Sequence, residues 1–310
     1  MRLVVALGGN ALLRRGERPD AEPQRLNVVH AVESLAPFAA EHELVVTHGN
    51  GPQVGVLALE SAADPMLTIP FPLDPLGAET QGLIGYWLAQ GLGNALPGRR
   101  IAALLTQCVV DASDPAFATP TKFVGPTYDE ATARGLAAER NWAVAPDGGS
   151  WRRVVASPEP RRVVEADVVR LLVEAGVVVV CAGGGGVPVV ETSAGALEGV
   201  EAVIDKDHTS ALLAEVLGAD ALLLLTDVAG VETDFGQPGS EVMREVTPAE
   251  LRAHHFPAGS MGPKVDAVCR FVERTGGIAA IGSLNEAVAV LAGTSGTRVT
   301  CRHRVDLLRS

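Results

Sequence analysis

Lysine is almost missing from this 310-residue sequence, in which only three of the 25 basic residues are lysines. The other 22 are arginines, so guanidinium groups supply nearly every positive charge. Arginine and lysine are not interchangeable where a compact ammonium must meet a phosphate or a carboxylate. Lys122, Lys206 and Lys264 are therefore candidate site residues. The alternative interpretation is a genome biased against lysine codons, with three lysines left at arbitrary positions.

The sequence also lacks a long apolar run, a basic cluster and paired cysteines. No apolar run approaches the ~18–20 residues that cross a bilayer, and the run over residues 3–7 ends too early for a signal peptide. A net charge of −12 argues against nucleic acid and anionic membranes as partners. The four cysteines are far apart without a CxxC pattern, which is typical of small buried residues in a reducing compartment. We expect a cytoplasmic protein.

Short aliphatic runs alternate with amphipathic segments along most of the chain. Hydrophobic residues make up 47% and charged residues 20%, which is typical of a globular chain. The runs predict buried strands at Arg2–Leu7, Glu43–Thr47, Ile101–Thr106, Val177–Cys181, Ala221–Thr226 and Gly277–Ile281. The segments between them predict helices over Gln24–Glu41, Leu76–Leu96, Val163–Ala175, Thr209–Leu217, Thr247–His254, Lys264–Arg274 and Asn285–Leu291. This alternation predicts an α/β fold, a parallel sheet covered by helices on both faces.

One long stretch, residues 111–157, departs from the alternation. It is rich in proline, glycine and aspartate, carries Trp142 and Trp151, and predicts at most one short helix, over residues 129–140. A segment too long for an ordinary connection usually indicates a functional insertion or flap. Farther along the chain, Gly195 and Gly199 interrupt the pattern, so we place a boundary between two lobes near residue 197.

Glycine-rich turns follow the ends of three predicted strands. Such turns let backbone N–H groups approach an anion closely, and ligands of open α/β sheets gather at the carboxyl ends of the strands. A single turn of this kind is more often only a tight turn, but three together predict an anion pocket. The turns contain Gly8, Gly9 and Asn10; Gly49, Asn50 and Gly51; and Gly183 and Gly184.

The three lysines lie beside turn residues. Lys206 precedes a predicted helix, Lys264 follows a Gly-Pro turn that opens another, and Lys122 follows Pro120-Thr121 in the irregular stretch. Other motifs fail on spacing: there is no GxxxxGK[ST], no HExxH, and the glycines after His48 are one residue too long for GxGxxG. A dinucleotide-binding dehydrogenase stays open as a weaker alternative.

Seven segments resemble carbamate kinases, of the amino-acid-kinase fold, in order along nearly the whole chain. Two of them, WRRVVASP and EGVEAVIDKD, are long and unusual enough to separate this family from others of the same fold. The segments are Ala6–Leu12, Thr47–Gly55, Asp114–Gly125, Trp151–Pro158, Ala182–Pro188, Glu198–Asp207 and Ala258–Lys264.

The resemblance implies a three-layer αβα sandwich around a mainly parallel sheet. It also implies an acceptor lobe over residues 1–197, a nucleotide lobe over residues 198–310, a protruding subdomain over about residues 111–157, and a homodimer. The implied substrates are ATP or ADP and carbamate or carbamoyl phosphate, with Mg²⁺ accompanying the nucleotide.

Site roles follow from the same resemblance. Lys206 and Lys264 contact the transferred phosphoryl group, and Lys122 reaches the substrate from the protruding subdomain, alone because Ala118 stands where some relatives have a second lysine. Asp205 lies between the lysines and orients them. The glycine turns after the first two strands, and Gly183 and Gly184, surround the substrate. The residues implied near the nucleotide are Thr226, Asp227, Met261 and Pro263.

Two other functions stay open. The chain could be another small-molecule kinase of this fold, such as one acting on an acylamino acid, although the WRRVVASP segment argues against it. It could instead be a non-catalytic sensor of a nucleotide or of carbamoyl phosphate, although such a protein could have lost the lysines that this chain keeps.

Overall fold

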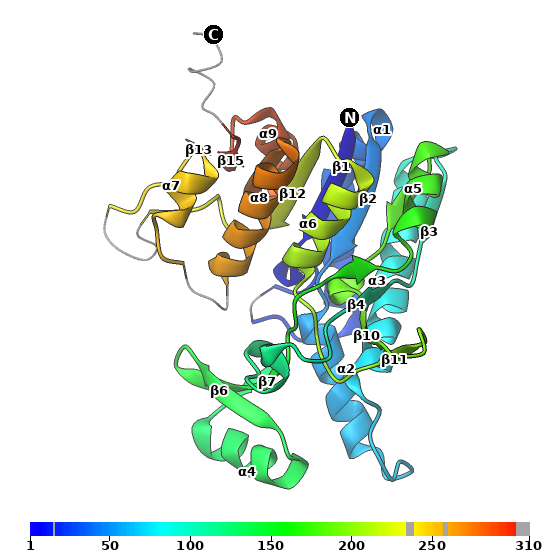
Figure 1. Cartoon of the computed structure of the whole chain (residues 1–310), viewed down its shortest axis with the longest axis vertical. Coiled ribbons are helices and arrows are strands. Elements are labelled where there is room, and N and C mark those ends of the chain that lie inside the picture. Colours follow the sequence, from blue (N-terminus) through cyan, green and yellow to red (C-terminus); the bar gives the residue numbers. More distant parts are fainter. Residues whose placement is uncertain (15, 234–238, 257–259, 302–310) are drawn as a thin grey trace.

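An eight-stranded sheet forms the centre of the computed structural model, which describes residues 1–14, 16–233, 239–256 and 260–301. Its strand order is β13-β15-β14-β12-β1-β2-β9-β3, and every neighbouring pair is parallel except β14 with β15. The expected mainly parallel α/β sheet is therefore confirmed (Figure 1). The strands are β1 (Arg2–Leu7), β2 (Glu43–His48), β3 (Ile101–Ala103), β9 (Val178–Val180), β12 (Ala221–Thr226), β13 (Glu245–Val246), β14 (Ile278–Ser283) and β15 (Thr297–Val299).

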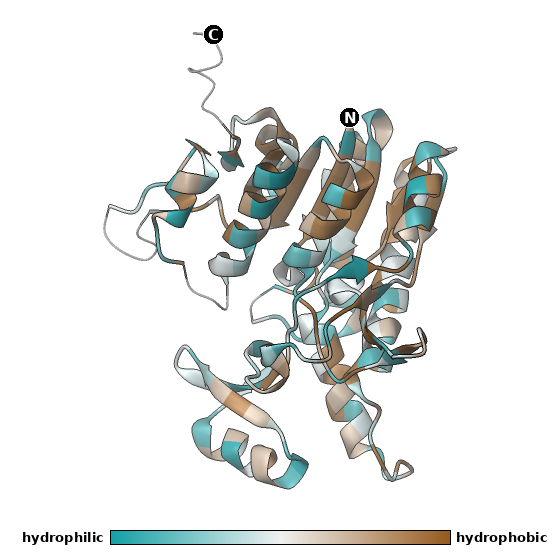
Figure 2. Cartoon of the chain, in the orientation of Figure 1, coloured by the Kyte–Doolittle hydropathy of each residue, from teal (hydrophilic) through white to brown (hydrophobic). Residues whose placement is uncertain are grey.

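Helices cover both faces of this sheet because alternate strand side chains point to opposite sides. In β1, Leu3 and Val5 belong to the apolar core that contains α1 (Ala21–Glu41), α3 (Leu73–Ala95) and α9 (Ala287–Ala292). Val4 and Ala6 belong to the opposite core, which contains α5 (Ala166–Glu174), α6 (Lys206–Leu217), α7 (Pro248–Arg252) and α8 (Met261–Thr275). Figure 2 shows that the central strands are almost uniformly apolar, as expected of a sheet buried on both faces.

Several observed elements differ from those predicted. Residues 51–63 form a helix, α2 (Gly51–Ala63), which was not predicted because the glycine-rich turn obscured its start at Gly51. The helix predicted to end at residue 254 ends at Arg252. A small second sheet, with strand order β11-β10-β4-β8, was not predicted from the sequence. Its strands are β4 (Gln107–Val109), β8 (Arg162–Val163), β10 (Val187–Glu191) and β11 (Leu197–Gly199).

Three cysteines are buried as expected, but Cys301 is exposed. Burial raises the pKa of Cys181 to about 12, so this thiol stays protonated and packs as an apolar side chain. Across the described parts of the chain, no helix combines the length and the apolar character needed to cross a bilayer.

Residues 122–155 form a small subdomain that projects from the body of the molecule (Figure 1). The expected helix is present as α4 (Glu130–Arg140), but the expectation of little other regular structure was wrong. Three antiparallel strands pair in the order β5-β7-β6, with bounds β5 (Lys122–Tyr128), β6 (Ala143–Asp147) and β7 (Ser150–Val155). The tryptophans support this sheet: Arg153 stacks over Trp142 at 4.5 Å and Arg134 over Trp151 at 4.6 Å.

The subdomain packs on α2 where two glycines cross. Gly125 has a φ of +72° at the irregularity in β5, and a Cβ added to Gly55 would overlap its backbone. Lys122 lies three residues before this crossing, so the crossing also sets the position of its side chain.

We expect Gly55→Ala to push the subdomain away from α2. Overpacking of this kind costs about 1–3 kcal/mol of unfolding free energy, and displacement of Lys122 should lower turnover in addition. Gly135→Ala in α4 is a matched control, because it meets open space and removes a helix glycine, which should stabilise by about 0.5–1 kcal/mol. Thermal unfolding and kcat of both variants test this; equal behaviour of the two would contradict it.

Candidate active site

The carboxyl ends of β1, β2 and β12 bring two of the predicted glycine turns together. Gly8 N donates to Leu225 O at 2.8 Å, and Gly49 N donates to Leu7 O at 3.0 Å. A Cβ on Gly49 would lie only 2.9 Å from Gly9 N, so the turns after β1 and β2 are in direct contact. Gly51 begins α2 immediately beyond this contact, which directs the N-terminus of that helix toward the same region.

The turn after β9 closes against the turn after β2. Gly184 has a φ of +62°, and a Cβ there would overlap the buried side chain of Asn50, whose Nδ2 donates to Thr80 Oγ1 at 2.8 Å. A Cβ on Gly183 would overlap the ring of His48. Burial lowers the pKa of His48 to about 4, so this imidazole is neutral and serves packing. The three glycine turns predicted to form one anion pocket therefore lie side by side.

Two of the three lysines meet at one carboxylate. Lys206 begins α6, Lys264 lies in the first turn of α8, and both side chains are mostly buried. Lys206 Nζ donates to Asp207 Oδ1, and Lys264 Nζ donates to Asp207 Oδ2 at 2.8 Å. Burial alone would raise the pKa of the Asp207 carboxyl, but the two ammonium groups outweigh burial and hold it below its ordinary value.

Asp205, which was predicted to orient the lysines, hydrogen-bonds Lys122, whereas the adjacent carboxylate of Asp207 hydrogen-bonds Lys206 and Lys264. Asp205 Oδ1 caps α6 by accepting from Asp207 N at 2.8 Å, and its Oδ2 accepts from Lys122 Nζ. The difference arises because a residue at the helix N-cap turns its carboxylate back onto the helix end, whereas a residue in the first turn faces the neighbouring helix. Burial would raise the pKa of Asp205, but the charges of Lys122, His208 and Lys206 lower it overall.

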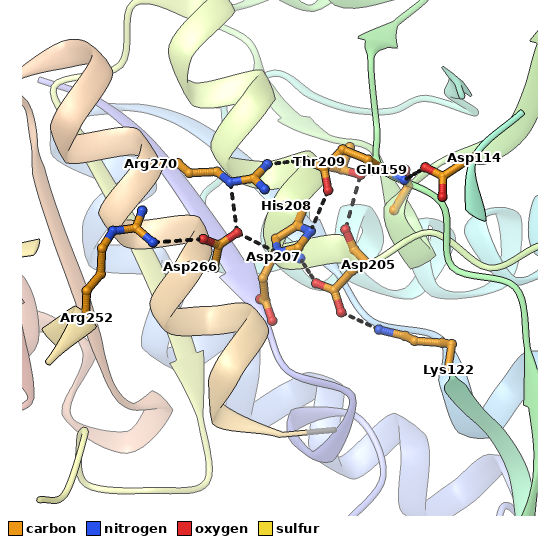
Figure 3. Close-up of polar contacts among 11 residues, drawn as sticks. Asp114, Lys122, Glu159, Asp205, Asp207, His208, Thr209, Arg252, Asp266 and Arg270 are labelled. Carbon is orange, nitrogen blue, oxygen red and sulfur yellow. Dashed lines mark hydrogen bonds and ion pairs between the residues drawn. The ribbon is translucent and has the colours of Figure 1, made fainter. Parts of the chain in front are cut away.

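The subdomain thus delivers Lys122 to Asp205 at the start of α6 (Figure 3), next to the carboxylate that Lys206 and Lys264 share. Lys206 also lies against the glycine turns, since a Cβ on Gly49 would be 3.5 Å from its Cδ. Among the described residues, no group of three or more His, Cys, Asp or Glu could hold a metal ion by itself.

The residues predicted near a nucleotide lie on two neighbouring elements. Thr226 ends β12, and its Oγ1 donates to Asp227 Oδ1 at 3.0 Å. Met261 and Pro263 form the first turn of α8 with Lys264, whose raised pKa owes part of its increase to Asp227. Burial on its own would lower that pKa, and Asp207 contributes the largest opposing effect. Ala258, at the start of the predicted AGSMGPK segment, is outside the described residues.

Asp207 is the site residue that the sequence analysis missed. Its signal was present, because it directly follows Lys206 in the segment EGVEAVIDKD. Two aspartates flank that lysine, however, and the sequence contains nothing to say which of them faces α8.

Comparisons with known proteins identify the family of this chain. The amino acid kinase family matches residues 1–281, and the chain belongs to this family. It is 52% identical over 303 residues to a carbamate kinase of Rhizobium meliloti, covering 97% of this chain and 93% of that protein. It is 51% identical to a carbamate kinase of Haemophilus influenzae, covering 97% of each.

Solved structures show the same likeness. A carbamate kinase from Giardia lamblia bound to citric acid superposes with a TM-score of 0.91 at 39% identity, covering 96% of this chain and 98% of that one. The same enzyme bound to AMP-PNP superposes with a TM-score of 0.86, with the same coverage. The family expected from the sequence is therefore confirmed.

Proposed function

We propose that this protein is a carbamate kinase, which transfers a phosphoryl group reversibly between ATP and carbamate. The observation that carries the proposal is the clamp formed by Lys206, Asp207 and Lys264 beside three glycine turns. Identities of about half to carbamate kinases over nearly the whole chain support this acceptor over others used within the fold.

Phosphoryl transfer requires in-line positioning and neutralisation of charge on the moving group, with little covalent chemistry by the protein. Carbamate is already an anion, so no general base is needed to make it nucleophilic. Its oxygen attacks the γ-phosphorus of ATP as the bond to the β-phosphate oxygen breaks, which leaves carbamoyl phosphate and ADP. The lysines stabilise the negative charge on the phosphoryl oxygens, and the glycine N–H groups receive the anionic substrate.

Each site residue has a role in this proposal. Lys206 and Lys264 contact the transferred phosphoryl group, and Lys122 reaches the carbamoyl end from the subdomain. The acceptor is held by the three glycine turns, which contain residues 8–10, 49–51 and 183–184. The nucleotide lies against Thr226, Asp227, Met261 and Pro263.

Mg²⁺ would be held mainly by the phosphate oxygens of the nucleotide. The described residues form no metal cage of their own, and the Asp207 carboxylate is already occupied by two lysines. This fits the preference of Mg²⁺ for substrate phosphates over all-protein sites. When bound, the ion would neutralise phosphate charge beside the lysines.

Carbamoyl phosphate is a mixed anhydride that readily passes its phosphoryl group to ADP. We therefore propose that the physiological direction is ATP formation in the cytoplasm, during breakdown of arginine or purines.

A coupled assay that follows ATP formation from carbamoyl phosphate and ADP with Mg²⁺ tests the function. Acetylglutamate phosphate serves as the control substrate, since an acylamino-acid kinase would prefer it. Tight binding of carbamoyl phosphate or nucleotide without turnover would indicate a sensor. Faster turnover of acetylglutamate phosphate than of carbamoyl phosphate, or binding without turnover, would overturn the proposal.

The pH dependence should identify Lys206. Burial lowers the pKa of its ammonium to about 8, with Asp207 opposing and Lys264 adding to the decrease. Above about pH 8 this group loses its charge in the free enzyme, so we expect kcat/KM to fall as pH rises. The corresponding decrease in kcat should occur at higher pH than the decrease in kcat/KM, because bound phosphates favour the charged form of Lys206. A constant kcat/KM up to about pH 10, with coupling enzymes in excess, would contradict this.

We further propose a homodimer formed through α3 and the connection between α2 and α3. Large apolar side chains are exposed there, which is unusual for a monomer surface. Light scattering on a gel-filtration column should give a molar mass about twice the 32.1 kDa of one chain. The double variant Ile69→Asp, Tyr86→Lys should have the molar mass of a single chain. A monomeric wild-type protein would overturn this. The exposed side chains are Met66, Ile69, Phe71, Leu83 and Tyr86.

A further inference from the structure

A closed group of ion pairs lies next to the lysine site, and the proposed reaction does not use it (Figure 3). We call it the His208 ring, and it consists of Glu159, His208, Asp266 and Arg270. Glu159 follows β7 in the segment that returns from the protruding subdomain. His208 lies in the first turn of α6, and the other two residues lie on α8.

Both nitrogens of the His208 imidazole face carboxylates. Nδ1 lies 3.3 Å from Glu159 Oε2, and Nε2 lies 3.4 Å from Asp266 Oδ2, an ion-pair separation without hydrogen-bond geometry. A neutral imidazole has one N–H and one lone pair, so one nitrogen would turn a lone pair toward a carboxylate oxygen. The protonated imidazolium instead places a positive charge beside both carboxylates and turns no lone pair toward either. The geometry therefore favours the charged form.

Arg270 closes the ring from the other side. Its Nη1 pairs with Glu159 Oε1, and its Nε lies 2.8 Å from Asp266 Oδ2. Arg252 of α7 approaches Asp266 Oδ1 at 3.4 Å and also pairs with Glu273. Within the described parts of the chain, the other charges near His208 are Asp205, at the N-cap of the same helix, and Lys122, which pairs with Asp205.

The ring joins the segment that returns from the subdomain to the two helices that carry the active-site lysines. Glu159 N donates to Asp114 Oδ2 at 2.9 Å, and Asp114 caps the short turn at the start of the inserted segment. Both ends of the insertion that carries Lys122 are thus linked to His208. On the helix side, His208 lies two residues after Lys206, and Asp266 lies two residues after Lys264.

We propose that His208, as an imidazolium, is a positioning residue that holds the subdomain, α6 and α8 in the one arrangement in which the three lysines converge. The inference rests on the proposed function, because it assigns a role in the same site. Loss of the imidazolium proton would leave Arg270 as the bridge between the Glu159 and Asp266 carboxylates, and the subdomain would loosen from α8.

The surrounding carboxylates keep His208 charged at a higher pH than is usual for a histidine. Burial lowers its pKa, but Glu159, Asp205 and Asp266 together outweigh burial and raise it above 6.5. A raised histidine pKa contributes stability that is fully present below the unfolded-state value and is lost as pH rises through the folded value. The positioning effect should disappear over the same pH range.

His208→Gln tests the proposal, because glutamine keeps polarity but cannot carry the charge. At about pH 6 we expect kcat to fall about tenfold with KM changed less, since the lysines act mainly in the transition state. The ratio of wild-type to variant kcat should approach one at alkaline pH, above the folded-state pKa of His208, where the wild-type protein also lacks the charge. Taking the ratio removes the contribution of Lys206, which titrates in both. His30→Gln, at an exposed histidine of α1, is the matched control and should leave the rate unchanged at both pH values.

A second measurement needs no activity. The pKa of the His208 imidazole, followed by NMR, should lie above 6.5 in the wild-type protein and fall in Glu159→Gln. A pKa that Glu159→Gln does not change would overturn the inference, as would a kcat ratio that is the same at both pH values. Wild-type protein that makes no ATP would instead overturn the proposed function, and the NMR titration would still decide whether the ring holds His208 charged.

Discussion

Replacement of either Lys206 or Lys264 by alanine is expected to lower kcat about 10²–10³-fold while the protein folds normally. Each lysine neutralises charge that develops on the phosphoryl oxygens, and removal of one such preorganised donor typically has an effect of this size. The measurement is the rate of ATP formation from carbamoyl phosphate and ADP at saturating substrate.

Arginine at either position should also impair the enzyme. A planar guanidinium has a different reach and donor geometry from a compact ammonium, so charge alone does not restore the contact. Arg274→Ala is a suitable control, because it removes a cation from the same helix, α8, where the side chain forms an exposed pair with Glu215. Circular dichroism and thermal unfolding establish that the variants are folded. Near-wild-type turnover in Lys206→Ala or Lys264→Ala would contradict the proposed clamp.

Replacement of Asp207 by asparagine should have an effect of similar size, about 10²-fold in kcat, for a different reason. Removing one partner of a buried ion pair leaves the other charges uncompensated, which costs about 3–5 kcal/mol. Lys206 and Lys264 would then repel each other across a neutral side chain, and both ammonium groups would lose protons more readily. We expect the alkaline limb of kcat/KM to move to lower pH, together with a lower melting temperature.

Asp205→Asn is the matched comparison, because it makes the same change two residues earlier. Asparagine is as good an N-cap as aspartate, so this variant keeps the start of α6 and loses the charge that faces Lys122 and His208. Its kcat should fall less than that of Asp207→Asn, and its alkaline limb should move less. The opposite order would show that Asp205 is the carboxylate that holds the lysines.

The periodicity of the sequence predicted the central sheet and most of its helices, because strands buried on both faces require continuous aliphatic runs. β1, β12 and α1 begin and end within a few residues of their predicted bounds. The second helix, α2, was not predicted, since the glycines at its start favour a turn as much as a helix. The strands of the subdomain were also missed, because they are half-exposed and interrupted by prolines and glycines.

The scarcity of lysine singled out three positions, and the structure brings all three to one end of the sheet. Residue type and turn context were sufficient for that, because a compact charge beside a glycine turn has few structural uses. Which carboxylate each lysine meets depends instead on side-chain direction at the start of α6 and on the approach of α8, 57 residues away along the chain. The same holds for His208, whose partners come from the subdomain and from α8. Local sequence thus determined the elements and the candidate cations, whereas the charges that face one another were decided only when distant elements packed together, since ion pairs form between neighbours in space.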